Sequence, residues 1–316
     1  MNILILGAAG FIGTNLTIKL AENKNNNITL VDKSKDYFQN ILNMHIENIS
    51  IKESNLDVET DFDQLLKNQK VIYHLVSTTV PTTSNQHISQ ELVSNVIFSS
   101  NLFEACVRCG VEKVVFISSG GTVYGKAVGC PLKEMTPINP ISSYGVQKVT
   151  IEKLLYLYNY MYGLDYRIIR LANPYGPYQR PNGILGAVTT FTYKALRGEE
   201  ITVFGDGSVV RDFIYIDDAV RAIMKVVEGK NSHHTFNIGC GYGTSINQVL
   251  DQIQNSLGVR LNIIYKDGRQ VDVPVNYLDI SKYEKYFGEL NPIRLEEGVK
   301  KTAEFMKKHN DIYQIL

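Results

Sequence analysis

Two residues near the middle of the chain have the types and spacing needed for acid–base chemistry. Tyr144 and Lys148 lie four positions apart in a segment with helical periodicity, so both side chains fall on one helix face. An ammonium group beside a phenol lowers the pKa of the phenol, and the phenolate can then accept a proton near neutral pH. This spacing is common by itself. Here the pair follows a strand-like run that ends in Ser118-Ser119. The pair and this run together favour a site for proton transfer.

The N-terminal glycines predict a site for a dinucleotide. Gly7, Gly10 and Gly13 follow a strand-like apolar run and open a helical segment. Glycines let the backbone turn tightly and approach a pyrophosphate, whose charge suits a helix N-terminus. Asp32 ends the next apolar run, nineteen residues after Gly13. Its carboxylate would accept hydrogen bonds from a ribose hydroxyl and repel a 2′-phosphate. We therefore expect NAD rather than NADP, although two lysines follow Asp32 closely.

The elements that would position these residues alternate between strand and helix. Short apolar runs separated by helical segments predict parallel strands with helical crossovers, the Rossmann-type doubly wound α/β fold. The expected strands are Asn2–Leu6, Ile28–Val31, Val71–Val76, Val114–Ile117 and Tyr166–Leu171. The expected helices between them are Thr14–Glu22, Val93–Cys109 and Ile141–Tyr162. Gly163 is predicted to cap the last of these helices at its C-terminus.

The character of the chain changes after Asn173, where prolines and glycines mark irregular loops. We expect residues 1–173 to form an NAD-binding Rossmann domain, with later returns to its sheet at about residues 210–240. Residues 174–316 would form mainly a smaller substrate-binding region. Its expected elements are a helix at Gly186–Arg197, a strand at Ile201–Phe204 and an amphipathic helix at Leu295–Lys308.

Composition excludes several classes of function. The 316 residues include 32 basic and 32 acidic side chains, so the chain lacks the basic excess typical of nucleic-acid binders. No apolar run approaches the ~20 residues of a transmembrane helix, and Met1–Leu6 has no basic lead-in, so we expect a cytoplasmic protein. Cys106 and Cys109 form a C-x-x-C without a second ligand pair, which favours structural cysteines and no metal site.

These features together resemble the extended short-chain dehydrogenase/reductase superfamily. Within it, the chain is similar to the NAD-dependent epimerase/dehydratase family of the UDP-glucose (UDP-galactose) 4-epimerase type. The similarity extends along nearly the whole chain. Besides the residues above, it rests on His74-Leu75-Val76, Asn95, Ser118–Gly125, Asn173–Pro177, Gly205-Asp206-Gly207, Arg211-Asp212-Phe213, Asn237-Ile238-Gly239, Arg269 and Asp272.

The resemblance implies further site residues. Those implied for the cofactor are Gly7, Gly10, Phe11, Ile12, Gly13, Asp32, Asn55, Leu56, Leu75, Val76, Ser77, Asn95, Ser118, Tyr144 and Lys148. Those implied for a nucleotide-diphosphate sugar are Asn173, Arg211, Arg269 and Asp272; two guanidinium groups suit phosphate oxygens, of a nucleotide or of a lipid diphosphate. By analogy, a homodimer would form through helices at roughly residues 89–110 and 142–162.

One position departs from the pattern of the family. A Ser or Thr usually stands four residues before the Tyr of the V-Y-G motif, where this chain has Gly120. Ser119 and Thr122 flank the gap, and Thr122 is the first candidate to supply the hydroxyl that shares the sugar proton with Tyr144. Related dehydratases carry an Asp-Glu pair where this chain has Gly121-Thr122, which argues against dehydration.

The sequence is compatible with three functions. The favoured one is a nucleotide-sugar 4-epimerase of the UDP-hexose class, with tightly bound NAD, a 4-keto intermediate and Tyr144 as base. The alternative enzyme is an NAD(P)H-dependent 4-keto-6-deoxyhexose nucleotide reductase, which Gly120 slightly favours. The alternative outside catalysis is an NAD-binding scaffold, since fold alone does not fix function. The presence of both Tyr144 and Lys148 argues against the scaffold.

Overall fold

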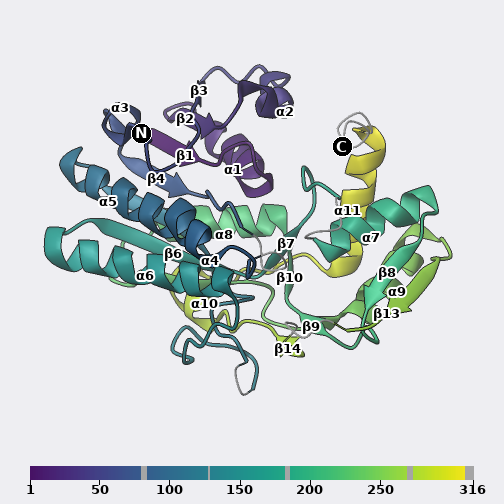
Figure 1. Cartoon of the computed structure of the whole chain (residues 1–316). Helices are drawn as coiled ribbons and strands as arrows, with labels where there is room; N and C mark the ends of the chain where they lie inside the picture. The colour runs from purple at the N-terminus through teal and green to yellow at the C-terminus, as the bar shows by residue number, and fades with distance from the viewer. Residues whose placement is uncertain (80–83, 127–128, 182–185, 269–272, 310–316) are drawn as a thin grey trace. The chain divides into compact units, whose positions relative to one another are not determined.

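The computed structural model describes residues 1–79, 84–126, 129–181, 186–268 and 273–309 (Figure 1). The chain divides into two compact units, and neither is continuous in sequence. The first comprises Met1–Val123, Ser142–Ile169 and Lys230–Thr235, and the second comprises Tyr124–Ile141, Arg170–Gly229 and Phe236–Leu316. The division of labour expected between a cofactor-binding and a substrate-binding region stays a prediction.

A seven-stranded sheet confirms the expected Rossmann-type fold. Its strand order is β11-β6-β5-β4-β1-β2-β3, and β1 runs parallel to both β2 and β4. Crossovers therefore lead away from β1 in both directions, as in a doubly wound sheet. The strands are β1 (Asn2–Leu6), β2 (Asn27–Asp32), β3 (Ile49–Glu53), β4 (Val71–His74), β5 (Lys113–Ser119), β6 (Asp165–Leu171) and β11 (Thr235–Ile238). The sequence did not predict β3.

The helices of the first unit cover this sheet. They are α1 (Phe11–Ala21), η1 (Lys35–Phe38), α2 (Gln39–Leu42), α3 (Phe62–Leu66), α4 (Ile88–Glu91), η2 (Leu92–Ile97), α5 (Phe98–Arg108) and α6 (Ser143–Tyr162). α5 and α6 lie side by side (Figure 1). The Ser142 hydroxyl caps α6 and left-handed Gly163 ends it. The single helix expected at Val93–Cys109 instead begins in α4 and contains a π-helical turn, η2.

The core of the first unit is built from the apolar residues whose periodicity defined its elements. Leu4 and Leu6 of β1 and Val114 and Phe116 of β5 are fully buried. Strand residues of this kind read as nearly continuous apolar runs because both faces of a parallel sheet are covered. Leu56 also lies in this core.

The second unit contains three small sheets, ordered β10-β7, β12-β9-β14 and β13-β8. Their strands are β7 (Asn173–Tyr175), β8 (Ile201–Phe204), β9 (Val210–Arg211), β10 (Phe213–Tyr215), β12 (Thr244–Ser245), β13 (Ile263–Lys266) and β14 (Val275–Asn276). The helices are α7 (Ala187–Arg197), α8 (Ile216–Glu228), α9 (Ile246–Leu257), α10 (Ser281–Phe287) and α11 (Leu295–Lys308). α7, α9 and α11 pack together around an apolar cluster (Figure 1).

Across the described ranges, no helix has the length and apolar character needed to cross a membrane.

Candidate active site

The turn between β1 and α1 has the shape required for close approach of a ligand. Gly7 has φ +79°, a conformation that glycine adopts without strain. A Cβ at Gly13 would stand 2.6 Å from the Ala8 carbonyl oxygen, so only glycine fits there. Gly10 is the N-cap of α1, and no side chain of the described residues caps it. The backbone N–H groups of the first turn, which includes Phe11 and Ile12, therefore point out of the helix end, as a pyrophosphate site requires.

Asp32 lies at the end of β2 and is fixed next to this turn. Its carboxylate accepts hydrogen bonds from the backbone N–H of Ala9 at 3.0 Å and of Lys33 at 2.9 Å. The Gly7 and Ala8 backbone N–H groups both donate to the Val31 carbonyl oxygen. Strand β2 and the glycine turn thus hold each other, and the carboxylate is fixed beside the turn.

The other predicted cofactor residues of the first unit differ in exposure. Asn55 is exposed, whereas Leu56 is buried and takes a left-handed conformation with φ +51°. Leu75 and Val76 are half-buried. Their backbone lies next to the turn, since a Cβ at Gly7 would stand 3.2 Å from it. Ser77 is exposed, and its hydroxyl donates to the Thr79 carbonyl oxygen at 2.9 Å. The structure thus brings Leu75 and Val76, but not the Ser77 side chain, to the glycine turn.

Tyr144 and Lys148 lie on the first two turns of α6, on one face as predicted. The Lys148 Nζ stands 5.4 Å from the centre of the Tyr144 ring and donates to the Ile117 carbonyl oxygen at 2.9 Å. Tyr144 is half-buried. Burial raises the pKa of Tyr144 to about 12, opposite to the lowering expected from the lysine. The cost of desolvating a phenolate is therefore the larger effect in this environment.

Buried charges tie Lys148 to the end of β5. Burial lowers the pKa of Lys148 to about 8, and the nearby carboxylate of Glu152 acts in the raising direction. The Glu152 Oε1 also accepts a hydrogen bond from the Ser118 hydroxyl at 2.6 Å. Lys148, Glu152 and Ser118 are all buried. Glu152, which sequence reasoning missed, lies one helical turn beyond Lys148, and that spacing was the only signal for it.

Ser119 and Thr122 occupy the turn after β5. The backbone N–H groups of Thr122 and Val123 point to the Ser119 carbonyl oxygen at 3.4 and 3.2 Å. Ser119 and Thr122 are half-buried residues. The Thr122 hydroxyl oxygen is itself buried and has no hydrogen-bond partner among the described residues. A buried hydroxyl without a partner is costly, which marks Thr122 as available to a ligand in a way that Gly120 cannot be.

Asn95 belongs to a buried hydrogen-bond network rather than standing alone. Its amide nitrogen donates to the Gln147 side-chain oxygen at 2.8 Å, and its amide oxygen accepts from the Thr78 N–H at 3.0 Å. The Gln147 amide and the Ser143 hydroxyl both donate to the Glu91 carboxylate, at 2.9 and 2.7 Å. This network joins the residues flanking Tyr144 to the segment after β4. The π-helical turn η2 carries Asn95, and such turns recur at functional sites.

His74 is a second group that sequence reasoning assigned no role. Its Nε2 lies 2.8 Å from the Ser99 hydroxyl, which donates to the Asn95 carbonyl oxygen at 2.5 Å. Because that hydroxyl proton is already used, Nε2 carries the imidazole proton. Nδ1 has no partner in the described part of the chain. Burial, followed by the charge of Lys148, lowers the pKa of His74 to about 3, so the imidazole stays neutral.

The second unit carries the predicted substrate residues. Asn173 begins β7, and both its backbone N–H and its side-chain amide donate to the Asp212 carbonyl oxygen, at 3.0 and 2.9 Å. Arg211 ends β9, and its Nη1 donates to the Val273 carbonyl oxygen at 2.6 Å. Asn173 is thus hydrogen-bonded to Asp212, and Arg211 directly precedes Asp212 in the sequence. Arg269 and Asp272 lie outside the described residues.

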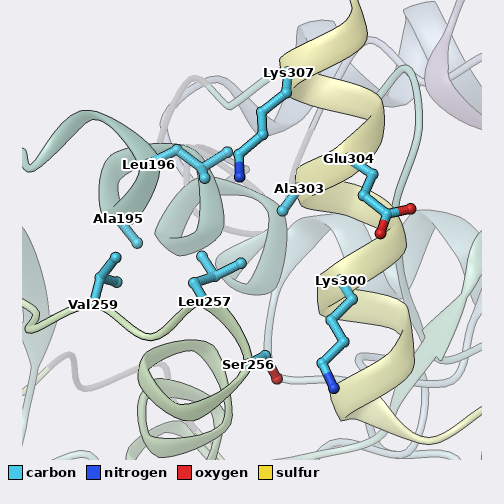
Figure 2. A pocket seen from close by; sticks show the side chains of 9 residues that line it. All are labelled: Ala195, Leu196, Ser256, Leu257, Val259, Lys300, Ala303, Glu304 and Lys307. Atoms are coloured by element: carbon cyan, nitrogen blue, oxygen red, sulfur yellow. The ribbon is translucent and has the colours of Figure 1, made fainter.

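A pocket of about 330 Å³ in the second unit is separate from the predicted residues. It lies where α7, α9 and α11 meet, and Figure 2 shows Lys300, Glu304 and Lys307 on α11 beside apolar side chains such as Leu196 and Leu257. Its lining residues are Ala195, Leu196, Ser256, Leu257, Val259, Lys300, Ala303, Glu304 and Lys307. None of the predicted site residues is among them, so this pocket is not the candidate active site.

The fold and these residues define a class of protein, which comparison with known sequences identifies. The sequence model of the NAD dependent epimerase/dehydratase family matches residues 3–239, three quarters of the chain. This chain therefore belongs to that family, as its sequence motifs predicted.

Individual relatives resemble the chain over its full length. A putative UDP-glucose 4-epimerase of Methanocaldococcus jannaschii is 36% identical over 310 residues, covering 98% of this chain and 99% of the relative. The crystal structure of UDP-glucose 4-epimerase from Thermotoga maritima, with UDP-glucose, is 35% identical with a TM-score of 0.89, over 98% and 99% of the two chains. UDP-glucuronic acid 4-epimerase from Bacillus cereus, in complex with UDP-glucuronic acid and NAD, is 27% identical with a TM-score of 0.89, again over 98% and 99%.

Proposed function

We propose that this protein is an NAD-dependent nucleotide-sugar 4-epimerase acting on a UDP-hexose. The observation that carries the proposal is the placement of Tyr144 and Lys148 on α6, anchored to the end of β5, in a unit that also holds the glycine turn and Asp32. The full-length similarity to 4-epimerases of UDP sugars supports the same reaction.

The first unit fits NAD. The glycine turn leaves no room for side chains at Gly13 and exposes the first-turn N–H groups of α1 to the pyrophosphate. Asp32 would accept the ribose hydroxyls, and the 75–77 segment would line the same side. When bound, NAD would supply the acceptor for the C4 hydride of the sugar and the donor that returns it to the opposite face. The chain itself must orient the sugar and move the proton of its C4 hydroxyl.

Tyr144 would accept that proton and give it back after the sugar has turned over. The pKa of about 12 means that the phenolate needs positive charge nearby to form at neutral pH. Lys148 already stands beside the Tyr144 ring on the same helix face, and the nicotinamide ring would supply the further charge. Thr122, whose buried hydroxyl oxygen has no partner among the described residues, would pass the proton between the sugar and Tyr144 in place of the residue missing at Gly120. Ser119 is the second candidate for this role.

The substrate would be held through its diphosphate by the second unit. Arg211 offers guanidinium donors, and Asn173 a polar side chain at the start of the short strand β7. We infer the same role for Arg269, and we propose Asp272 as a further substrate-binding residue. Binding energy from the nucleotide would anchor the substrate while the free hexose rotates between its two faces.

The test is turnover without added reductant. Purified protein containing NAD is incubated with UDP-glucose and UDP-N-acetylglucosamine, and the products are followed by NMR. Appearance of the C4 epimer supports the proposal, and Tyr144→Phe should abolish it. Absence of conversion of every UDP-hexose tested would overturn it. Tyr160→Phe, on the exposed side of α6, is a matched control that keeps activity.

Gly120 favours a second candidate, a 4-keto-6-deoxyhexose nucleotide reductase, because the hydroxyl usual for epimerases is absent there. A reductase consumes one NAD(P)H for each sugar, whereas an epimerase shows no net redox change. Loss of absorbance of the reduced nicotinamide with a TDP-4-keto-6-deoxyhexose, stoichiometric with product, would assign the protein to this class.

A homodimer and a cytoplasmic location also remain proposals. Exposed apolar residues follow helical spacing on η2 and α6: Val93, Ile97, Val146 and Leu157. An apolar face of this kind on a helix pair suits a second copy of the chain. Sedimentation of the wild type and of Leu157→Glu tests it, since the charged variant should be a monomer.

A further inference from the structure

Asp212 is a buried carboxylate at the junction of the segments that carry the predicted substrate residues. It lies between β9 and β10, and its exposed fraction is 0%. β9 belongs to the sheet β12-β9-β14 and β10 to the sheet β10-β7. Asp212 is therefore the single residue through which the chain passes from one small sheet to the other.

Backbone groups of two other segments converge on its carboxylate. The N–H groups of Cys240, Gly241 and Leu278 donate to it at 2.7, 3.4 and 3.3 Å. The carboxylate also fills the space beside Gly239, since a Cβ there would stand 2.3 Å from Asp212 Oδ2. Its side chain thus fastens the loop after β11 and the segment after β14 to the junction.

The main chain of Asp212 holds the predicted substrate residues themselves. Its carbonyl oxygen accepts both hydrogen bonds of Asn173, and Arg211 is its immediate neighbour in sequence. Arg211 in turn donates to the Val273 carbonyl oxygen at 2.6 Å. Every described part of the predicted diphosphate site is therefore bonded to Asp212 or adjacent to it.

We propose that Asp212 is the positioning residue of the substrate site, whose ionised carboxylate holds the Arg211 and Asn173 strands in the geometry that binds the diphosphate. The inference rests on the proposed function. Asp212 would not touch the sugar or the cofactor, so its effect falls on substrate affinity and not on the proton transfer at Tyr144. A protonated carboxyl group has one acceptor oxygen fewer for the converging N–H groups, so the site loosens when Asp212 gains a proton.

That protonation falls within an accessible pH range. Burial raises the pKa of Asp212 to about 6, against the three backbone hydrogen bonds that act to lower it. The titratable groups that face it from the loop after β11 are Cys240 and Tyr242. Burial raises the pKa of both, to about 12 for Tyr242, so neither is charged near pH 6. Arg211 keeps its charge throughout.

The experiment measures KM and kcat for UDP-glucose from pH 5 to pH 8 with NAD-saturated enzyme. A nucleotide sugar is the right probe, because the terminal phosphate of a free nucleoside diphosphate titrates at about pH 6. If only ionised Asp212 holds the site, the pKa of about 6 predicts that KM rises about tenfold from pH 7 to pH 5. Asp212→Asn should raise KM at least tenfold at pH 7.5, leave kcat within about twofold, and show no further rise toward pH 5.

Two further variants separate positioning from folding. Gly239→Ala adds a methyl group that displaces the Asp212 carboxylate without removing its charge. KM should therefore rise, and the dependence of KM on pH should persist. Asp251→Asn, an exposed aspartate on α9, should match the wild type in both constants. If Asp212→Asn does not fold, the wild-type pH series and Gly239→Ala still test the inference.

A wild-type KM that is constant from pH 5 to pH 8 would overturn the inference, as would an Asp212→Asn enzyme with unchanged KM. Calorimetric titration of UDP-glucose onto the same proteins keeps this result separate from the proposed function. Binding with the predicted pH dependence but without epimerisation would contradict the epimerase and support the role of Asp212.

Discussion

The neutral His74 predicts a specific loss of stability in mild acid. The pKa of its imidazole is about 3 in the folded chain against 6.5 for the free side chain. Below pH 6.5 the unfolded chain binds a proton here and the folded chain does not, so the free energy of unfolding falls as the pH falls. Between pH 7 and pH 5 this single group should remove about 2 kcal/mol.

The perturbation is His74→Gln, whose side-chain N–H can still donate to Ser99 but does not titrate. Loss of the ring will lower the free energy of unfolding by a similar amount at every pH. The test is therefore the slope of this free energy against pH, and not the constant difference between the two proteins. Urea unfolding followed by far-UV circular dichroism, at a fixed NAD concentration, gives the free energy at pH 5, 6, 7 and 8. The wild type should lose about 2 kcal/mol more than His74→Gln between pH 7 and pH 5.

A matched variant replaces an exposed histidine. His87 is exposed, so the pH slope of His87→Gln should equal that of the wild type. Parallel curves for the wild type and His74→Gln, within about 0.5 kcal/mol, would refute the reasoning that the buried imidazole stays neutral. The ring proton resonances of His74 provide a second measurement on the unmodified chain, and they should not shift between pH 8 and pH 5.

Three further outcomes follow from the first unit. Thr122→Val should lower kcat by about 10²-fold or more with little change in KM. Thr122→Ser keeps the hydroxyl and should therefore be active. Equal rates for both variants would show that Thr122 has no part in the mechanism. Glu152→Gln should lower the pKa of Lys148 further below its ordinary value, because a charge that raises it is lost; the basic limb of kcat/KM should move to lower pH, and an unmoved limb would contradict the assignment. Gly13→Ala should release NAD on gel filtration, because its Cβ would stand 2.6 Å from the Ala8 carbonyl oxygen; an unchanged absorbance of bound cofactor would contradict the tight turn.

The elements that local pattern determines could be predicted closely. The structure places a strand at Asn2–Leu6, a strand at Ile201–Phe204 and a helix at Leu295–Lys308, each with the predicted bounds. In these segments the periodicity of apolar residues is enough, because burial of one face or of both decides the conformation. The π-helical turn at Leu92–Ile97 was not predictable. It occurs where Asn95 reaches partners such as Gln147, far away in sequence.

The residues of the candidate site likewise include some that the sequence could predict and some that it could not. Gly7, Asp32, Tyr144 and Lys148 could be found because their spacing along one element carries the signal. The buried polar partners could not, since a glutamate or histidine in isolation is more often exposed. Their roles come from contacts between distant segments, such as that between Ser118 and Glu152. A raised pKa at Tyr144 also required the surroundings that only the fold supplies.

The position of β11 at the edge of the seven-stranded sheet has a consequence for synthesis on the ribosome. β11 pairs with β6, yet it begins more than sixty residues after β6 ends. At ~5–20 residues per second, the growing chain would carry an unpaired β6 edge for roughly 3 to 13 s. Such an edge offers free N–H and C=O groups to other nascent chains. Premature termination anywhere between the two strands should therefore yield aggregates or chaperone complexes in place of a folded cofactor-binding fragment.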